Sequence, residues 1–202
     1  MHNDPDRRRF LRATLAATLM APVAAGPLAA LTTPEARRLI DRLVSEINAV
    51  IDSGARQDQM YRRFEDVLRR YADMNIVARS VLGAEARSAS PEQLRAFTDA
   101  FTGYLSRKYG KRFHEFVGGR LEVTGAREVR GLQEVTALAR LPGEEPFEVV
   151  FLVSDKSGQQ KFFNMYVEGV NMVASERSEI GAMLDRRGGN LDSLISHLRS
   201  AG

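Results

Sequence analysis

The 202-residue chain contains no cysteine and no tryptophan, and it has only three histidines. Without cysteine there are no disulfide bonds, thiol nucleophiles, iron–sulfur clusters or thiolate zinc sites. The sequence also lacks the G-x-S-x-G, P-loop and H-E-x-x-H motifs. His2 precedes the expected domain, and His114 and His197 have no partner at metal-ligand spacing, so we expect structural or solvent-facing roles. The sequence therefore predicts no catalytic residue, no cofactor and no metal site.

Most of the chain also lacks a strong net charge. The formal net charge is +3, but residues 1–30 hold four arginines and two aspartates, which leaves 25 basic and 24 acidic residues in the remainder. A domain that binds nucleic acid through its phosphates is usually strongly basic on one face. We therefore expect no nucleic acid among the partners.

The N-terminal residues have the pattern of an export signal. Arginines come first, a mild apolar run over residues 13–25 follows, and small residues come next. The run is too short to cross a bilayer as a helix. Arg7 and Arg8 begin the stretch R-R-R-F-L-R, which resembles the twin-arginine export pattern, and an ordinary secretory signal is the alternative. We expect a protein exported to the periplasm.

Two cleavage positions suit this signal. Small residues stand at Ala25, after Val23 and Ala24, and again at Ala30, and the pattern does not choose between them. In either case the sequence divides into a signal peptide at residues 1–30 and a single domain at residues 31–202. About 170 residues can bury some 70% of their unfolded surface, which is enough for a core without disulfides.

Hydrophobic periodicity in the domain is first helical, then alternating, then helical again. Capping residues mark the helix starts: Thr33 before Pro34, Ser90 before Pro91, and Asn190. The expected helices cover residues 33–51, 57–70, 75–82 and 90–110, a turn near 113–117, and a last helix after 190. The expected strands are Arg120 to Val129, Glu134 to Leu141, Phe147 to Ser154, Gln160 to Val167, and Val170 to Ser175.

Short links rich in turn residues predict an antiparallel meander. In "FEVVFLVS" at residues 147–154 both alternating sets are apolar, so we expect both faces of the sheet to be covered. The fold class is α+β: N-terminal helices packed on a curved, mostly antiparallel five-stranded sheet with a C-terminal helix, and an apolar cavity between them.

Large apolar side chains are abundant, with ten phenylalanines, seven methionines and five tyrosines. Each of them taken singly fits an ordinary core. Together, on a curved sheet covered by helices, they can leave a slot for an apolar ligand, and methionine adapts to variable shapes. The candidate lipid-binding residues are Phe64, Leu68, Ile76, Val81, Phe97, Phe101, Leu105, Val149, Phe151, Phe163, Met165, Val167 and Val170.

The stretch "QKFFNMYVEGVNMVASER" at residues 160–177 resembles the MlaC family, periplasmic phospholipid carriers also called toluene-tolerance auxiliary proteins. The family pattern is approximately W-K-V-Y-D-V-x-V-E-G-V-S-L-V-x-x-Y-R. The matching positions are Lys161, Val167, Glu168, Gly169, Val170, Val173 and Arg177, and the departures are Gln160, Phe163, Asn164, Asn171 and Glu176.

Two further segments support this resemblance. Phe64, Asp73, Ile76 and Leu82-Gly83, followed by "SPEQLRAFTDAFTGYLSRKYG", resemble the family's F-x-x-x-x-D-x-x-x-I-A-x-x-x-L-G and the helix after it. The ending "GGNLDSLISHL" is similar to the family's G-x-x-x-L-I-x-x-L. The order of the segments, which span nearly the whole domain, carries the resemblance more than any single motif does.

The resemblance implies a phospholipid cargo whose tails lie between sheet and helices and whose headgroup points to solvent. It also implies shuttling between an outer-membrane lipoprotein complex and an inner-membrane ABC transporter complex, with no catalytic residues. Two alternatives stay open. One is a non-catalytic periplasmic adaptor with a filled core. The other is an enzyme acting on an apolar substrate in a similar cone-shaped fold, with Asn164 or Tyr166 in its pocket.

Overall fold

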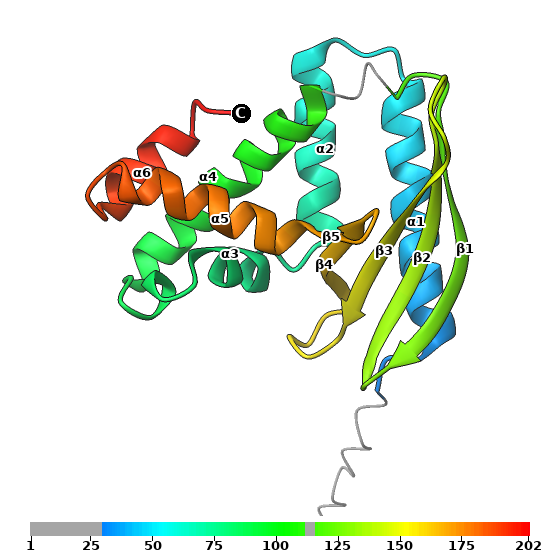
Figure 1. Ribbon diagram of the computed structural model, residues 1–202, viewed down its shortest axis with the longest axis horizontal. Coiled ribbons are helices and arrows are strands. Elements are labelled where there is room, and N and C mark those ends of the chain that lie inside the picture. The colour runs from blue at the N-terminus through cyan, green and yellow to red at the C-terminus, as the bar shows by residue number, and fades with distance from the viewer. Residues whose placement is uncertain (1–29, 112–115) are drawn as a thin grey trace, which may run out of the picture.

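The computed structural model describes residues 30–111 and 116–202 and has an α+β fold (Figure 1). The expected signal segment, except Ala30, and His114 lie outside the described residues. So does Phe113, part of the turn expected near 113–117. The elements in chain order are α1 (Thr33–Asp52), α2 (Gln57–Tyr71), α3 (Met74–Leu82), a 3-10 turn η1 (Glu85–Arg87), α4 (Pro91–Gly110), β1 (Arg120–Val129), β2 (Leu132–Arg140), β3 (Phe147–Ser154), β4 (Lys161–Val167), β5 (Val170–Asn171), α5 (Met172–Asp185) and α6 (Leu191–Leu198).

The five strands form one antiparallel meander in the order β1-β2-β3-β4-β5. The register shifts once in the β1–β2 pair, after Val123, and once in the β3–β4 pair, after Leu152. Such irregularities bend a strand and increase its twist, so the sheet curves. The expected fold class, with helices packed on a curved antiparallel sheet, is confirmed.

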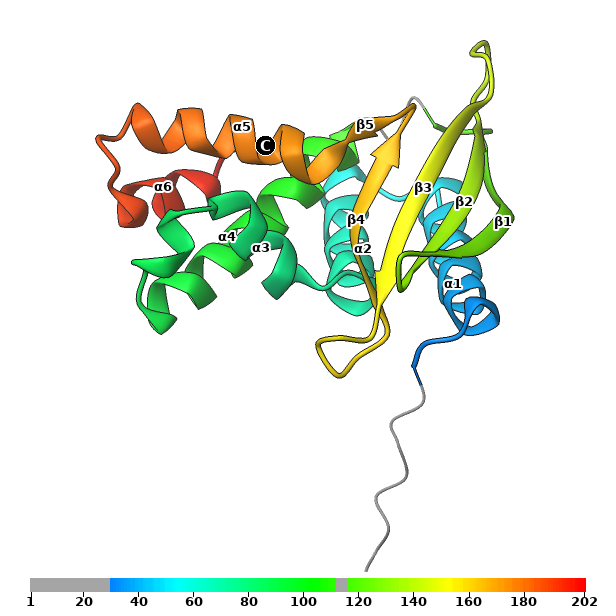
Figure 2. The same ribbon diagram turned by 60° about the horizontal axis from the view of Figure 1, so that its bottom comes forward.

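The helices are distributed unevenly over this sheet. α1 runs along one face of β1–β3, and α3, α4, α5 and α6 gather to one side, beyond β4, with α2 between them and α1 (Figures 1 and 2). In Figure 2 none of the described helices crosses the near face of β1–β3, where Val150 and Leu152 are half-buried. The expectation that both faces are covered is therefore wrong, although β3 carries apolar residues on both faces.

The C-terminal region differs most from the sequence expectation. A strand was expected from Val170 to Ser175, but β5 has only two residues and α5 starts at Met172. The Asn171 side chain accepts a hydrogen bond from Ala174 N at 3.0 Å and so caps α5. Two helices, not one, therefore follow the sheet.

Local sequence explains the other helix starts. Ser90 and Gln93 exchange hydrogen bonds at 3.1 Å each, a capping box at the start of α4, as expected. At α1 the cap is Thr32 instead of Thr33, and the Glu35 carboxylate accepts hydrogen bonds from both the amide and the hydroxyl of Thr32. Asn190 caps α6 through Ser193 N at 2.9 Å, as expected.

Candidate functional site

Two groups of aromatic side chains lie in the interior, one on α4 and one on the sheet. On α4 the rings of Phe97 and Phe101 are stacked with centroids 5.5 Å apart, and Tyr104 continues the stack at 6.1 Å. On the sheet, Phe151 meets Phe162 edge to face at 5.5 Å. Offset-stacked and edge-to-face contacts are the favourable geometries for such rings. Both groups belong to one continuous cluster of buried side chains.

The structure places most of the predicted lipid-binding residues in or against this cluster. Six are buried within it: Val81, Phe97, Phe101, Leu105, Val149 and Phe151. Four are half-buried and lie against it: Phe64, Leu68, Met165 and Val167. Three stand apart from it: Ile76 and Phe163, which are half-buried, and Val170, which is 54% exposed.

The four half-buried residues mark the edge of the interior. Met165 pairs with Phe151 and Val167 pairs with Val149 across the β3–β4 ladder, so all four side chains share one face of the sheet. Phe64 and Leu68 are four residues apart on α2 and lie on the same side of that helix. The apolar interior therefore becomes partly exposed on α2 and β4. These two elements meet at their ends, where Lys161 Nζ donates to Arg69 O at 3.0 Å and Ala72 pairs with Phe162 (Figures 1 and 2).

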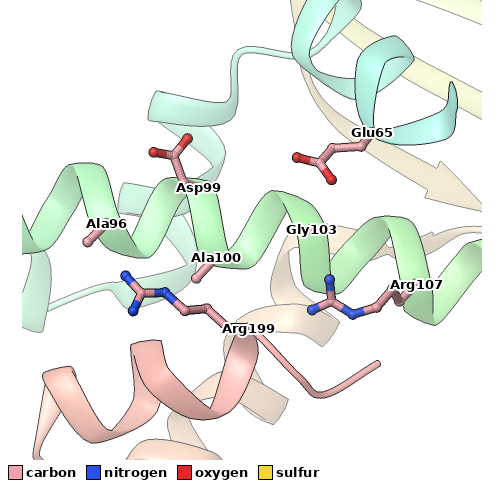
Figure 3. A pocket seen from close by; sticks show the side chains of 7 residues that line it. All are labelled: Glu65, Ala96, Asp99, Ala100, Gly103, Arg107 and Arg199. Atoms are coloured by element: carbon pink, nitrogen blue, oxygen red, sulfur yellow. The ribbon is translucent and has the colours of Figure 1, made fainter. Parts of the chain in front are cut away.

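Two surface hollows are charged and do not coincide with this interior. The first, about 440 Å³, has Ala96, Ala100 and Gly103 of α4 at its floor, with Arg107 and Arg199 on one side and Glu65 and Asp99 on the other (Figure 3). The second, about 360 Å³, is lined mainly by polar residues of α2, α3 and the β3–β4 loop. The predicted lipid-binding residues line neither hollow. Where the apolar cavity was expected, buried side chains fill the space.

A partly buried polar cluster joins α4 to α5 and was missed at the sequence level. Lys108 Nζ donates to Glu176 Oε1 at 2.7 Å and to Glu179 Oε2 at 2.5 Å. The Tyr109 hydroxyl donates to Glu176 Oε1, and the Tyr104 hydroxyl donates to Glu179 Oε1 at 2.6 Å. Only 6% of the Glu176 side chain is exposed, and among the described residues its Oε2 has no hydrogen-bond partner.

Burial and mutual contact shift the pKa values in this cluster. Burial raises the pKa of Tyr109, and its hydrogen bond to Glu176 raises it further. Burial alone would lower the pKa of Lys108, but the hydrogen bonds to Glu176 and Glu179 outweigh it and raise that pKa. Burial opposes ionisation of Glu179, yet the hydrogen bonds from Lys108 and Tyr104 hold its pKa below the ordinary value of 4.5. The arrangement favours a protonated lysine between two carboxylates.

The residues considered for an enzymatic pocket are engaged elsewhere. Asn164 donates to Asn171 Oδ1 at 3.1 Å, and Asn171 Nδ2 donates to the Tyr166 hydroxyl at 3.3 Å. These contacts tie β4 to the start of α5. Within residues 30–111 and 116–202, no group of three histidine or acidic side chains is placed to hold a metal ion, and no helix has the length and apolar character to cross a membrane.

Comparison with known proteins adds two findings. A sequence model of the MlaC protein family matches residues 37–200. The fold is similar to that of a phospholipid-binding protein from Ralstonia solanacearum, solved in complex with a phospholipid, with a TM-score of 0.69. The two are 18% identical, and the match covers 81% of this chain and 94% of that chain. At this identity the structural likeness establishes the fold.

Proposed function

Because this chain belongs to the MlaC family, we propose that it is a periplasmic phospholipid carrier whose apolar interior receives the acyl tails. The observation that carries the proposal is this family membership combined with an interior that becomes partly exposed at Phe64, Leu68, Met165 and Val167. The similarity in fold to a protein that was solved with a phospholipid supports the same function.

The size of the hydrophobic effect explains why a carrier needs such an interior. A diacyl lipid has about 30 methylene and methyl groups, and moving each from an apolar environment into water costs ~0.8 kcal/mol. Free transfer of the lipid through water therefore faces a barrier of roughly 20 kcal/mol. A protein that replaces water with apolar side chains removes most of that barrier. The tails need few polar contacts, which agrees with the small number of polar side chains in the interior: Asp73, Thr102, Ser106, Gln133 and Glu176 are its buried polar residues.

We propose that side chains of α2 and β4 at the edge of the closed interior move aside when lipid binds. Phe97, Phe101 and Phe151 are each at most 2% exposed, so tails reach them only after neighbouring side chains move aside. The half-buried residues Phe64, Leu68, Met165 and Val167 are the first that a tail would meet. We propose that the site consists of these four residues together with the buried set Val81, Phe97, Phe101, Leu105, Val149 and Phe151.

The proposed partners follow from the family. We propose that the chain shuttles phospholipid between an outer-membrane lipoprotein complex and an inner-membrane ABC transporter complex of the Mla type. Export by the twin-arginine route would carry the folded domain across the inner membrane. The proposal requires no catalytic residue and no cofactor beyond the lipid cargo.

One observation favours a second candidate, a non-catalytic periplasmic adaptor. The filled interior is what an adaptor that binds only proteins would have. Native mass spectrometry of the exported protein, followed by organic extraction, separates the two functions. The carrier predicts a bound mass that fragments as a phospholipid. An apo mass that stays unchanged after incubation with phospholipid vesicles would contradict the carrier and favour the adaptor.

A further inference from the structure

The larger surface hollow has no role in the proposed lipid site. It measures about 440 Å³ and lies over α4, between α2 and the end of α6 (Figure 3). Its floor consists of Ala96, Ala100 and Gly103, which follow one another along one side of α4. A Cβ atom at Gly103 would lie 3.1 Å from Arg107 Nη1. The small residues of the floor therefore leave space above α4 and make room for a guanidinium group.

The acidic wall of this hollow, formed by Glu65 and Asp99, already has a cation. Arg69 donates to Glu65 Oε1 at 2.7 Å and to Asp99 Oδ1 at 2.9 Å, so one guanidinium joins both carboxylates. Glu65 Oε2 takes no part in this contact and lies towards the floor, 3.7 Å from the place that a Cβ atom of Gly103 would take. The acidic wall is thus partly neutralised, and it still presents an acceptor oxygen to the hollow.

The basic wall, formed by Arg107 and Arg199, has no counter-ion. Arg107 is half-buried, and its guanidinium donates from Nε to Ala201 O at 2.8 Å and from Nη2 to Leu198 O. These carbonyl oxygens hold the group in place without cancelling its charge. Arg199 is exposed, and within the part of the chain that the structure describes neither arginine forms an ion pair with a carboxylate. Two positive charges therefore line one side of the hollow (Figure 3).

The group that suits the basic wall is a carboxylate, because a guanidinium can donate two parallel hydrogen bonds to it. The acidic wall argues against other sources of negative charge. A membrane surface rich in anionic headgroups would bring negative charge against Glu65 and Asp99 as well as against the arginines. One acidic side chain of a protein meets the basic wall alone, and its neighbours can donate hydrogen bonds to the acidic wall. Opposite charges on two facing walls also fix the orientation of a protein partner.

We propose that this hollow is a docking point for a protein partner, which inserts one aspartate or glutamate side chain against Arg107 and Arg199. The inference rests on the proposed function, which requires protein partners in two membrane complexes, and it names the face that one of them uses. None of the four half-buried residues at the edge of the apolar interior lines the hollow. A partner docked there therefore leaves those residues free to admit or release a lipid tail.

The test measures binding of the exported protein to the purified inner-membrane and outer-membrane complexes, each held in lipid nanodiscs on a biolayer sensor. We expect Arg199→Glu to raise the dissociation constant for one complex by about tenfold or more, because the change replaces an attraction with a repulsion. Binding of the parent to that complex should weaken as the salt concentration rises. Unchanged dissociation constants for both complexes in Arg199→Glu would overturn the inference.

Arg140 offers a matched control. It is an exposed arginine at the end of β2, on the opposite side of the molecule from α6 (Figure 1), and it forms no ion pair with another described residue. Arg140→Glu makes the same change in net charge and should leave both dissociation constants within about twofold of the parent. Equal weakening in the two variants would overturn the assignment to the hollow, since net charge alone would then account for the effect.

Two further measurements keep the inference testable if Arg199→Glu does not fold or if it weakens binding indirectly. Ala96→Gln leaves every charge in place and fills part of the floor, so it should weaken binding to the same complex, and normal binding would contradict the docking point. Acidic residues of that complex are also replaced by lysine one at a time. One such replacement should restore the affinity of Arg199→Glu, and failure at every acidic position would overturn the pairing.

Extraction of phospholipid from the same samples separates this inference from the proposed function. Lipid present in all proteins, with unchanged dissociation constants in the variants, means that the carrier function stands and the docking point fails. Weaker binding of the variants without lipid in any protein means that the docking point stands and the carrier function fails, which favours the adaptor. If the parent binds neither complex, the docking point fails, and the lipid content still decides the carrier function.

Discussion

The helical cover meets the sheet in two different ways. On the α1 side, side chains hydrogen-bond to backbone groups: Asn48 Nδ2 donates to Leu121 O at 3.0 Å, and Leu121 N donates to Asn48 Oδ1 at 3.1 Å. Gln133, buried in β2, likewise donates to Leu31 O at 3.0 Å. On the α2–β4 side, four apolar residues at the edge of the interior are only half-buried: Phe64, Leu68, Met165 and Val167. A polar contact lies at the margin, where Lys161 Nζ donates to Arg69 O at 3.0 Å.

Under the proposed function, this difference separates a fixed side from a side that opens to the cargo. Breaking the α1 side would leave backbone groups without partners, which is expensive inside a protein. Parting the α2–β4 side would expose apolar surface to water, which costs free energy. That cost disappears when a lipid tail covers the same surface. A carrier needs both properties, because one side must hold the fold together while the other admits cargo.

The largest expected effect tests whether the two sides share one core. Phe101 is fully buried between Phe97 and Tyr104, and Leu43 of α1 is 2% exposed. We expect Phe101→Ala to lower the free energy of unfolding by about 3–5 kcal/mol and Leu43→Ala by about 2–5 kcal/mol. Urea unfolding should show one transition for both. Val117→Ala, at a residue 56% exposed, should change stability by less than about 0.5 kcal/mol. Two separate transitions would show that the sides are independent units.

Much of the fold was predictable from sequence, and the reason is local. The caps at Ser90 and Asn190 and the alternation in residues 147–154 are short-range signals, so the helices and strands that depend on them appear where expected. α5 was not predicted as a helix because Val170, Met172 and Val173 are apolar at strand-like spacing, and its buried stripe contains a glutamate. The Asn171 cap was the one local signal that could have indicated it.

A smaller effect should come from removing one polar tie on the α1 side. Asn48→Ala deprives Leu121 of both hydrogen bonds, and we expect a loss of about 1–3 kcal/mol in the free energy of unfolding. Lipid uptake should not change, because α1 stays in place as the fixed side. Asn75→Ala, at an exposed position on α3, is the control and should be within about 0.5 kcal/mol of the parent. Loss of lipid uptake in a folded Asn48→Ala protein would refute the division into two sides.

A substitution at the opening side should affect cargo more than stability. Met165→Gln keeps the length of the side chain and adds a polar amide, so we expect lipid retention in a flotation assay to fall by about threefold to tenfold. Leu138 is also half-buried on the sheet, but it pairs with Glu122 and Glu148 on the face that no described helix covers. Leu138→Gln should retain lipid normally. Equal losses in the two variants would remove Met165 from the proposed site.

The apolar wall and the polar cluster at Glu176 differ in how far sequence could predict them. The apolar residues proposed for the wall follow from periodicity, and six of the thirteen are buried in one cluster. Glu176 could not be recognised in that way, because its position depends on α5 lying across α4 and on Lys108 and Tyr109 reaching it from another element. Polar clusters assembled across helices leave no short-range pattern.

The smallest expected effect concerns pH and the joint between α4 and α5. Lys108 and Tyr104 hold the pKa of Glu179 below its ordinary value of 4.5. As the pH falls, Glu179 therefore takes up a proton in the unfolded chain at a higher pH than in the folded one. The contribution of Glu179 to stability is therefore present above about pH 4.5 and declines as the pH falls towards the folded-state pKa. Its side chain is 41% exposed, so solvent screens the contact and the change in stability with pH should be slight.

The variant Glu179→Gln tests this contribution. In the parent protein the urea midpoint should fall between about pH 6 and pH 3, and in Glu179→Gln it should fall slightly less, because the contribution of one carboxylate is gone. Asp99→Asn serves as the control, because that side chain is 67% exposed and pairs with Arg69 away from this joint. An identical pH profile in Glu179→Gln and its parent would show that the joint gains nothing from the ionised carboxylate.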